Sequence, residues 1–175
     1  DSPMLEQAVY RQNRPASRSW ADSDRSRALY RSARERGRRG QFWSRLTGKP
    51  RGLLDLKSIE AGRNVRISHG GARRLVSISQ IGGSEGRASD FDREFNPLKD
   101  HVRKRWLGIA SAREQGVALP PVSLVQVGDV YYVKDGHHRI SVAKALGQET
   151  IEAKVAVWQV DSPFPGEMPV CEPVG

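Results

Sequence analysis

Five consecutive residues, Asp135-Gly136-His137-His138-Arg139, bring together side chains that could hold a phosphate group. Arginine presents a planar set of donors that matches phosphate oxygens, and histidine donates hydrogen bonds and titrates near neutral pH. Gly136 allows a turn with positive φ and a close approach between a ligand and the backbone. The residue types therefore favour a site for an anion, with phosphate as the first choice.

The flanking residues predict a strand before this turn and a helix after it. Val130–Lys134 is rich in β-branched and aromatic residues, and Arg139–Leu146 has a short helical pattern that ends at Gly147. The first N–H groups of a helix have no partner inside the helix, and the helix dipole adds positive charge there. An anion is the natural occupant of such a turn, and the hydroxyl of Ser141 is expected to add a donor. The alternative is a structural turn with a buried histidine, in which Arg139 pairs with a carboxylate.

The elements around this turn predict an α+β domain, in which a small mixed sheet is covered by helices. Val122–Val127 and Val130–Lys134 are separated only by Gly128-Asp129, which predicts an antiparallel hairpin. Apolar residues alternate between Ile151 and Val157, as in a final strand. Three further elements complete the prediction: a strand over Leu75–Ile81, a glycine-rich loop over residues 82–87, and a helix that opens at Pro97.

The front of the chain is a basic, arginine-rich helical extension, because residues 1–50 hold 12 Lys and Arg against 5 Asp and Glu. Asp22 or Asp24 is expected to cap a helix that runs to about Gly37. Shorter helical pieces are expected around residues 42–46 and over Leu53–Ala61. We divide the chain into the extension (1–62), the α+β domain (73–160) and an extended proline-rich tail (161–175).

The net charge of +9 suggests a second kind of partner. Residues 11–51 are predicted either to contact nucleic-acid phosphates, in a salt-sensitive way, or to pack on the mildly acidic C-terminal part. No apolar run approaches the roughly 18 residues of a membrane span, and the single Cys171 excludes an internal disulfide. These features predict a soluble, cytoplasmic protein that does not bind membranes.

The stretch from Leu119 to Trp158 resembles the ParB/sulfiredoxin superfamily in its proline pair, hairpin, Asp-Gly-His-His-Arg turn, short helix and final strand. A weaker likeness reaches back through the strand at 75–81 and the loop that carries Glu85 and Arg87. The resemblance implies that a nucleotide binds at the turn. The residues implied in binding are Gly136, His137, His138, Arg139, Ser141 and Arg87, although Arg87 could equally pair with Asp90 or Asp92.

Three branches of the superfamily differ at this turn. Sulfiredoxins place a catalytic cysteine where this chain has His137, so sulfiredoxin chemistry is not expected. Partitioning ParB proteins bind CTP through a turn of Gly-Glu-Arg-Arg character and carry a downstream helix-turn-helix domain. The branch that resembles free-serine kinases has a similar His-His-Arg turn and a catalytic glutamate. It implies Glu85, Asp135 and His137 as catalytic residues, ATP or ADP as cofactor, and Asp135 as a ligand of magnesium that arrives with the nucleotide.

These observations predict a ParB-like protein that binds a nucleotide or a phosphorylated ligand, with hydrolysis or transfer left open. The alternatives are a small-molecule kinase that acts on a hydroxyl substrate, and a non-enzymatic DNA- or RNA-binding protein. A protein metal cage is not expected, because His137 and His138 are adjacent while His69 and His101 lie in other segments. A two-metal nuclease is not expected either, because no carboxylate cluster is apparent.

Overall fold

The structure is a computed structural model that describes residues 23–61 and 65–160. Its helices are α2 (Asp24–Thr47), α3 (Lys57–Glu60), α4 (Arg103–Glu114) and α5 (His137–Ala145). Its strands are β1 (Leu54–Asp55), β2 (Val65–Ser77), β3 (Ile81–Ser84), β4 (Val122–Val127), β5 (Val130–Asp135) and β6 (Thr150–Val160). Two 3-10 turns, Ile78–Gln80 and Asp100–Val102, precede β3 and α4.

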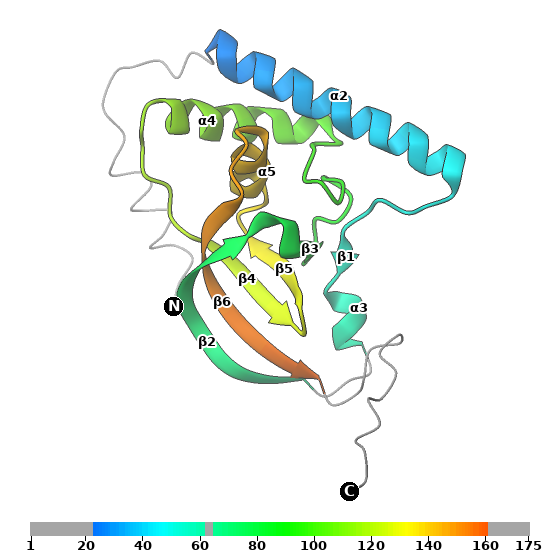
Figure 1. Cartoon of the computed structure of the whole chain (residues 1–175), viewed down its shortest axis with the longest axis vertical. Coiled ribbons are helices and arrows are strands. Elements are labelled where there is room, and N and C mark those ends of the chain that lie inside the picture. The colour runs from blue at the N-terminus through cyan, green and yellow to red at the C-terminus, as the bar shows by residue number, and fades with distance from the viewer. Residues whose placement is uncertain (1–22, 62–64, 161–175) are drawn as a thin grey trace, which may run out of the picture.

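The strands form one mixed sheet in the order β1-β3-β5-β4-β6-β2. Parallel pairs join β1 to β3, β3 to β5 and β4 to β6, whereas β5 pairs antiparallel with β4 and β6 with β2. Figure 1 shows α2 and α4 side by side, with α5 between them and the sheet. The predicted α+β fold is therefore confirmed, as are the hairpin of β4 and β5 and the final strand β6.

The sheet buries residues on both faces with the two-residue period of a strand. Val122 and Leu124 of β4 belong to the core under α4 and α5, whereas Val125 and Val127 face α3. The larger core also contains Phe91, Phe95, Trp106, Val133, Ile140, Ala153 and Val155, and the smaller one contains Leu56, Ile59, Tyr132 and Trp158. The two cores fix β5 between them, and β5 leads directly into the predicted phosphate turn.

The glycine-rich segment is a strand where the sequence predicts a loop. Gly82 and Gly83 belong to β3, which lies between β1 and β5, and the loop begins only after Ser84. A Cβ on Gly83 would lie 2.0 Å from the Tyr132 ring. Glycine is required here because the side chain of the neighbouring strand covers the backbone. The predicted strand over Leu75–Ile81 is also wrong in its middle, where Ile78–Gln80 form a 3-10 turn.

The helix α2 runs without a break to Thr47, although the sequence predicts that it stops near Gly37 and resumes later. A Cβ on Gly37 would lie 3.1 Å from the carbonyl oxygen of Pro97 and 3.1 Å from the Leu98 side chain. Gly37 therefore marks the place where α2 approaches the loop before α4. The helix ends at Gly48, whose φ is +68°.

Two other predicted helices differ in extent. The helix expected to open at Pro97 begins at Arg103, because Pro97 forms a β-bridge with Phe91. The helix expected over Leu53–Ala61 is divided into β1 and the single turn α3. At Pro97 a short-range backbone pairing with Phe91 replaces the local helical preference, and at Leu54–Asp55 a pairing with the distant strand β3 does so.

The N-cap of α2 is Ser23, not Asp22 or Asp24, since its Oγ accepts a hydrogen bond of 2.9 Å from the Ser26 amide. We expect Ser23→Ala to lower the free energy of unfolding by about 1 kcal/mol, because a helix N-terminal donor loses its acceptor. Urea denaturation would measure this change. Asp24→Ala is the matched control and should cost about half as much or less, since it removes only a favourable charge. An equal cost for the two variants would contradict the assignment of the cap.

The sheet takes strands from both sides of residue 73, where the α+β domain is predicted to begin. β1 lies within the predicted extension, and β2 begins at Val65. The whole proline-rich tail (161–175) and the first 22 residues lie outside the described residues. No helix in the described ranges is both long and apolar enough to cross a membrane.

Candidate anion-binding site

The start of α5 presents backbone donors that no side chain caps among the residues the structure describes. Gly136 separates β5 from α5 with φ +107°, and the first helical bond runs from the Ile140 amide to the Gly136 carbonyl oxygen at 3.0 Å. The amides of His137, His138 and Arg139 precede that bond and have no acceptor within the helix. Gly136 leaves no room for a side chain, because a Cβ would lie 2.5 Å from Val122.

His137 and His138 are both buried in the first turn of α5, where their rings contact Phe91. The ring of His137 stacks on that of Phe91, and the ring of His138 meets it edge-on at 5.3 Å between centroids. The Nε2 atom of His137 lies 2.7 Å from the Ser84 hydroxyl, so β3 holds this ring in place. The Nε2 atom of His138 is buried and, within the described ranges, has no hydrogen-bond partner.

Both histidines are neutral at physiological pH. Burial and the nearby Arg87 lower the pKa of His137 to about 4, while Asp135 and Asp90 oppose this shift. Burial, with Arg105 as the largest charge effect, lowers the pKa of His138 to about 4. Each neutral ring carries one N–H and one acceptor nitrogen. The fixed positive charge near this turn therefore comes from arginine.

Asp90 positions Arg87 at this site. The Arg87 Nη1 atom lies 3.3 Å from one carboxylate oxygen of Asp90, and His101 Nε2 lies 3.2 Å from the other. The Asp90 side chain is largely buried, whereas that of Arg87 is about half exposed. Asp90 is one of the two carboxylates that the sequence suggests as partners of Arg87, whereas no sequence signal points to His101 or Arg105. The apolar pattern after Pro97 predicts the helix that carries Arg105, but nothing in its basic run 103–105 indicates which side chain approaches the turn.

Arg139 is engaged inside the protein. Its Nη2 atom lies 2.5 Å from the Asp135 carboxylate, and its Nη1 donates to the carbonyl oxygens of Pro120 and Pro121, the latter at 3.0 Å. Arg139 thus connects the start of β4 to the turn. This arrangement matches the alternative in which the turn is structural and Arg139 pairs with a carboxylate. A role of Arg139 in phosphate binding, or of Asp135 on magnesium, would require these contacts to open.

Ser141 and Glu85 have different surroundings. The Ser141 hydroxyl donates to the Phe95 carbonyl oxygen at 2.6 Å and accepts from Trp106 Nε1 at 2.8 Å, so core partners occupy it. Glu85 follows β3, and its amide donates to the Val133 carbonyl oxygen at 2.9 Å. Its side chain is partly exposed and, in the part of the chain described, makes no hydrogen bond or ion pair.

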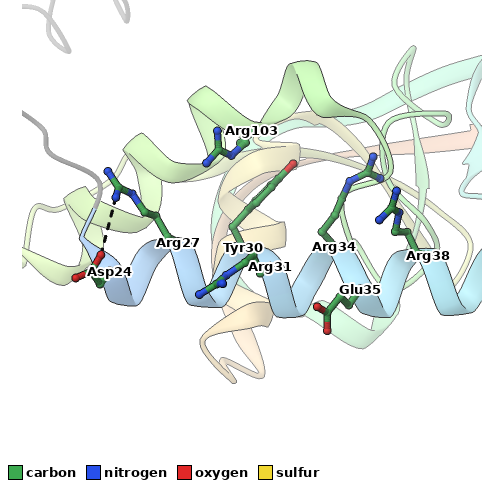
Figure 2. A pocket seen from close by; sticks show the side chains of 8 residues that line it. All are labelled: Asp24, Arg27, Tyr30, Arg31, Arg34, Glu35, Arg38 and Arg103. Carbon is green, nitrogen blue, oxygen red and sulfur yellow. Dashed lines mark ion pairs between the residues drawn. The ribbon is translucent and has the colours of Figure 1, made fainter.

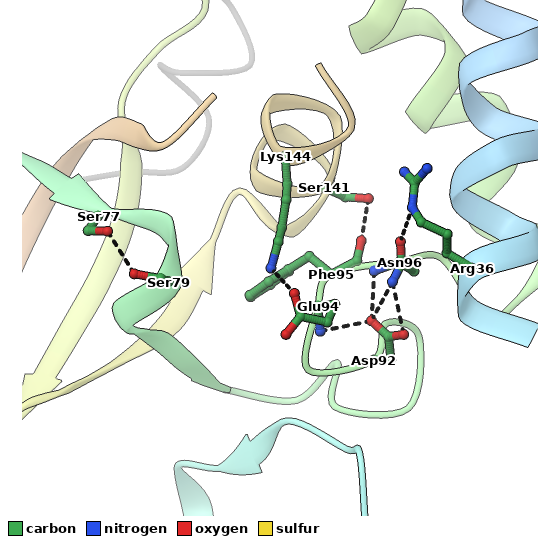
Figure 3. Close-up of polar contacts among 9 residues, drawn as sticks. All are labelled: Arg36, Ser77, Ser79, Asp92, Glu94, Phe95, Asn96, Ser141 and Lys144. Atoms are coloured by element: carbon green, nitrogen blue, oxygen red, sulfur yellow. Dashed lines mark hydrogen bonds and ion pairs between the residues drawn. The ribbon is translucent and has the colours of Figure 1, made fainter. Parts of the chain in front are cut away.

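The loop of residues 91–96 holds Phe91 against the two histidines. The Oδ1 atom of Asp92 accepts hydrogen bonds from the amides of Glu94 and Asn96, at 2.9 and 2.8 Å. Asn96 in turn accepts a bond from the Arg36 Nε atom of α2 at 3.3 Å (Figure 3). The loop is therefore closed by its own buried carboxylate and tied to the arginine-rich helix.

No group of three or more potential metal ligands from His, Cys, Asp and Glu occurs among the residues that the structure describes. His101 contacts Asp90, and His137 and His138 are held in the first turn of α5. The site is therefore composed of backbone amides, neutral imidazoles and arginines. This set of donors suits an anion rather than a cation.

Comparisons with known proteins give a distant likeness. No family model matches the chain, and no curated protein matches it. Among solved structures, sulfiredoxin from Arabidopsis thaliana is similar over 48% of this chain and 83% of its own, with 18% sequence identity and a TM-score of 0.35. A likeness at this level assigns no branch of the ParB/sulfiredoxin superfamily. The site has to be judged from its own geometry.

Proposed function

We propose that this protein binds a nucleotide or another phosphorylated ligand at the start of α5. The binding groups are the free amides after Gly136, the ring of His138 and the guanidinium of Arg87. The observation that carries the proposal is the buried Nε2 atom of His138, which has no partner among the described residues. It lies in the first helical turn, where the helix dipole already favours a negative group.

A buried polar atom without a partner costs about 1–3 kcal/mol. Native proteins tolerate few such atoms, and many of those that occur have a functional reason. A phosphate oxygen that accepts a hydrogen bond from His138 would remove this cost. Arg87 and Arg105 supply the positive charge, as their effect on the two histidine pKa values indicates.

The ligands that we propose are ATP, ADP or CTP, or a smaller phosphorylated compound, with magnesium carried by the nucleotide. A kinase reaction would need Asp135 as a base or magnesium ligand, but that carboxylate pairs with Arg139. Glu85 would then be the remaining carboxylate for an acceptor hydroxyl. No contact in the described chain favours catalysis over binding, so the proposal concerns binding.

A thermal-shift series with ATP, ADP, CTP and inorganic phosphate, each with and without magnesium, tests the proposal. A ligand at about one hundred times its Kd stabilises the native state by about 2.7 kcal/mol, so the Tm should rise by several degrees. His138→Phe should leave the Tm of the free protein equal or higher, because it removes the unpaired nitrogen, and should abolish the rise with ligand.

Arginine variants provide the matched control for this experiment. Arg87→Ala should remove most of the ligand-induced rise in Tm, whereas Arg113→Ala, on the same helix as Arg105 but outside the site, should leave it intact. The proposal fails if no phosphorylated compound raises the Tm of the unaltered protein. It fails equally if His138→Phe keeps the whole rise.

A further inference from the structure

A groove lined largely by charged side chains lies between α2 and α4, apart from the start of α5. Its volume is about 560 Å³. Figure 2 shows Tyr30, Arg34 and Arg38 projecting from α2 toward α4, which contributes Arg103. The full lining consists of Asp24, Arg27, Tyr30, Arg31, Arg34, Glu35, Arg38 and Arg103. None of these residues belongs to the candidate site at α5.

The arginines of α2 in this groove recur with the helical period. Arg27, Arg31, Arg34 and Arg38 are spaced by four, three and four residues, which places them along one side of the helix. At about 1.5 Å per residue they span about 16 Å along the helix axis. The groove therefore offers a row of positive charges rather than one basic point.

Most of this charge is not neutralised within the protein. Arg34 donates to Asp100 at 3.0 Å, and Arg27 is 3.9 Å from the fully exposed Asp24. Arg31, Arg38 and Arg103 have no ion pair or hydrogen bond in the described ranges of the chain. The lining therefore holds five arginines but only two carboxylates. One of the two carboxylates, Glu35, forms an ion pair of 3.6 Å with Arg39, which lies outside the lining.

Tyr30 gives an independent indication of a polar ligand. Its side chain is 94% buried against Trp106, with 5.3 Å between the ring centroids, yet its hydroxyl has no hydrogen-bond partner among the described residues. Burial raises the pKa of this phenol, and the charges of Arg34, Asp100 and Arg103 also act on it. A buried, neutral hydroxyl donor therefore belongs to a residue that lines the arginine-rich groove.

We propose that this groove binds the phosphodiester backbone of a nucleic acid, without sequence preference. Arginine forks match phosphate oxygens, and a row about 16 Å long parallels several phosphates of one strand, which rise about 3.4 Å per step. A single small phosphate would engage only part of the row. The repeated charge of a nucleic-acid strand therefore fits the groove better than one small anion does.

Fluorescence anisotropy with labelled single-stranded and duplex DNA of mixed sequence, at about 50–200 mM salt, measures this binding on the full chain. Arg31→Ala combined with Arg38→Ala should weaken binding by at least about tenfold and reduce the salt slope by roughly two. Arg25→Ala combined with Arg45→Ala removes the same charge from the same helix outside the groove, and should change affinity by less than about threefold. Tyr30→Phe, which removes only the hydroxyl, should weaken binding by about three- to tenfold.

Three outcomes would overturn this proposal. The first is no binding by the unaltered protein at the lowest salt, and the second is an equal loss for the two double variants, which would indicate diffuse attraction to basic charge. The third is equally tight binding of polyglutamate with the same dependence on Arg31 and Arg38, which would indicate an acidic protein partner. His138→Phe should leave DNA binding unchanged, so this test and that of the α5 site can fail separately.

Discussion

Lowering the pH from 7 to 4 should weaken the folded protein by several kcal/mol, because two buried histidines must take up protons. Burial holds the pKa of His137 and of His138 at about 4, against 6.5 for the ordinary side chain. The unfolded chain therefore binds more protons between these two values. The stabilisation is complete above pH 6.5, decreases as the pH falls through this window, and is lost below about pH 4. At 1.36 kcal/mol per pKa unit, each histidine contributes about 3 kcal/mol.

Urea denaturation at several pH values between 7 and 4 measures this dependence. The double variant His137→Gln, His138→Phe keeps a polar group near Ser84 and removes both titrating rings, so its stability should change much less with pH. Below about pH 4.5 a further loss is expected from Glu94, whose pKa is lowered by the hydrogen bond from Lys144. His101→Gln is the control, since that ring is exposed. A flat profile for the unaltered protein between pH 6.5 and 4.5 would show that the histidines are not buried as described.

Gly136→Ala should destabilise the protein by about 2–6 kcal/mol. The φ of +107° at this position is strained for any residue with a Cβ, at about 1–3 kcal/mol. The new methyl group would also lie 2.5 Å from Val122 Cγ1 in a packed core, and such overpacking costs about 1–3 kcal/mol. Both penalties fall on the turn that joins β5 to α5, so the arrangement of the amides should be disturbed together with the fold.

Gly147→Ala separates the two penalties of the Gly136 variant. Gly147 has a φ of +78°, but a Cβ there would meet no atom within 4 Å. We expect this variant to lower the free energy of unfolding by about 1 kcal/mol, because only the backbone conformation is unfavourable for alanine. The difference between the two variants in denaturation experiments measures the steric contribution of Val122. Equal costs would show that the turn can move away from β4.

The hairpin and the last strand could be predicted from the sequence because their determinants are local. Gly128 turns the chain with φ +58° between two β-branched runs, and the alternation from Ile151 to Val157 matches a strand with two different faces. The helix α5 was predicted for the same reason, although it begins at His137 rather than Arg139. Periodicity and turn chemistry are readable without knowing what packs on these elements.

The structural roles of three glycines could not be predicted from the sequence, because these roles depend on contacts with distant segments. Composition alone assigns Gly82 and Gly83 to a loop and Gly37 to a helix end, since glycine is unfavourable in regular elements. In the structure Gly83 belongs to a strand under the Tyr132 ring, and Gly37 lies where α2 meets the backbone at Pro97. The close approach that makes glycine necessary exists only after the chain has folded.

The sequence alone indicated the residue types of the phosphate turn, its place between a strand and a helix, and the excess of arginine in the first 50 residues. The tertiary structure decided which of these groups are free: Arg139 is held by Asp135 and the proline carbonyls, while the nitrogen of His138 has no partner in the described chain. It also brought Arg87, Asp90 and Arg105 to the turn from two other segments. A side chain's chemistry is set by its covalent structure, but its availability depends on neighbours that are far away in the sequence.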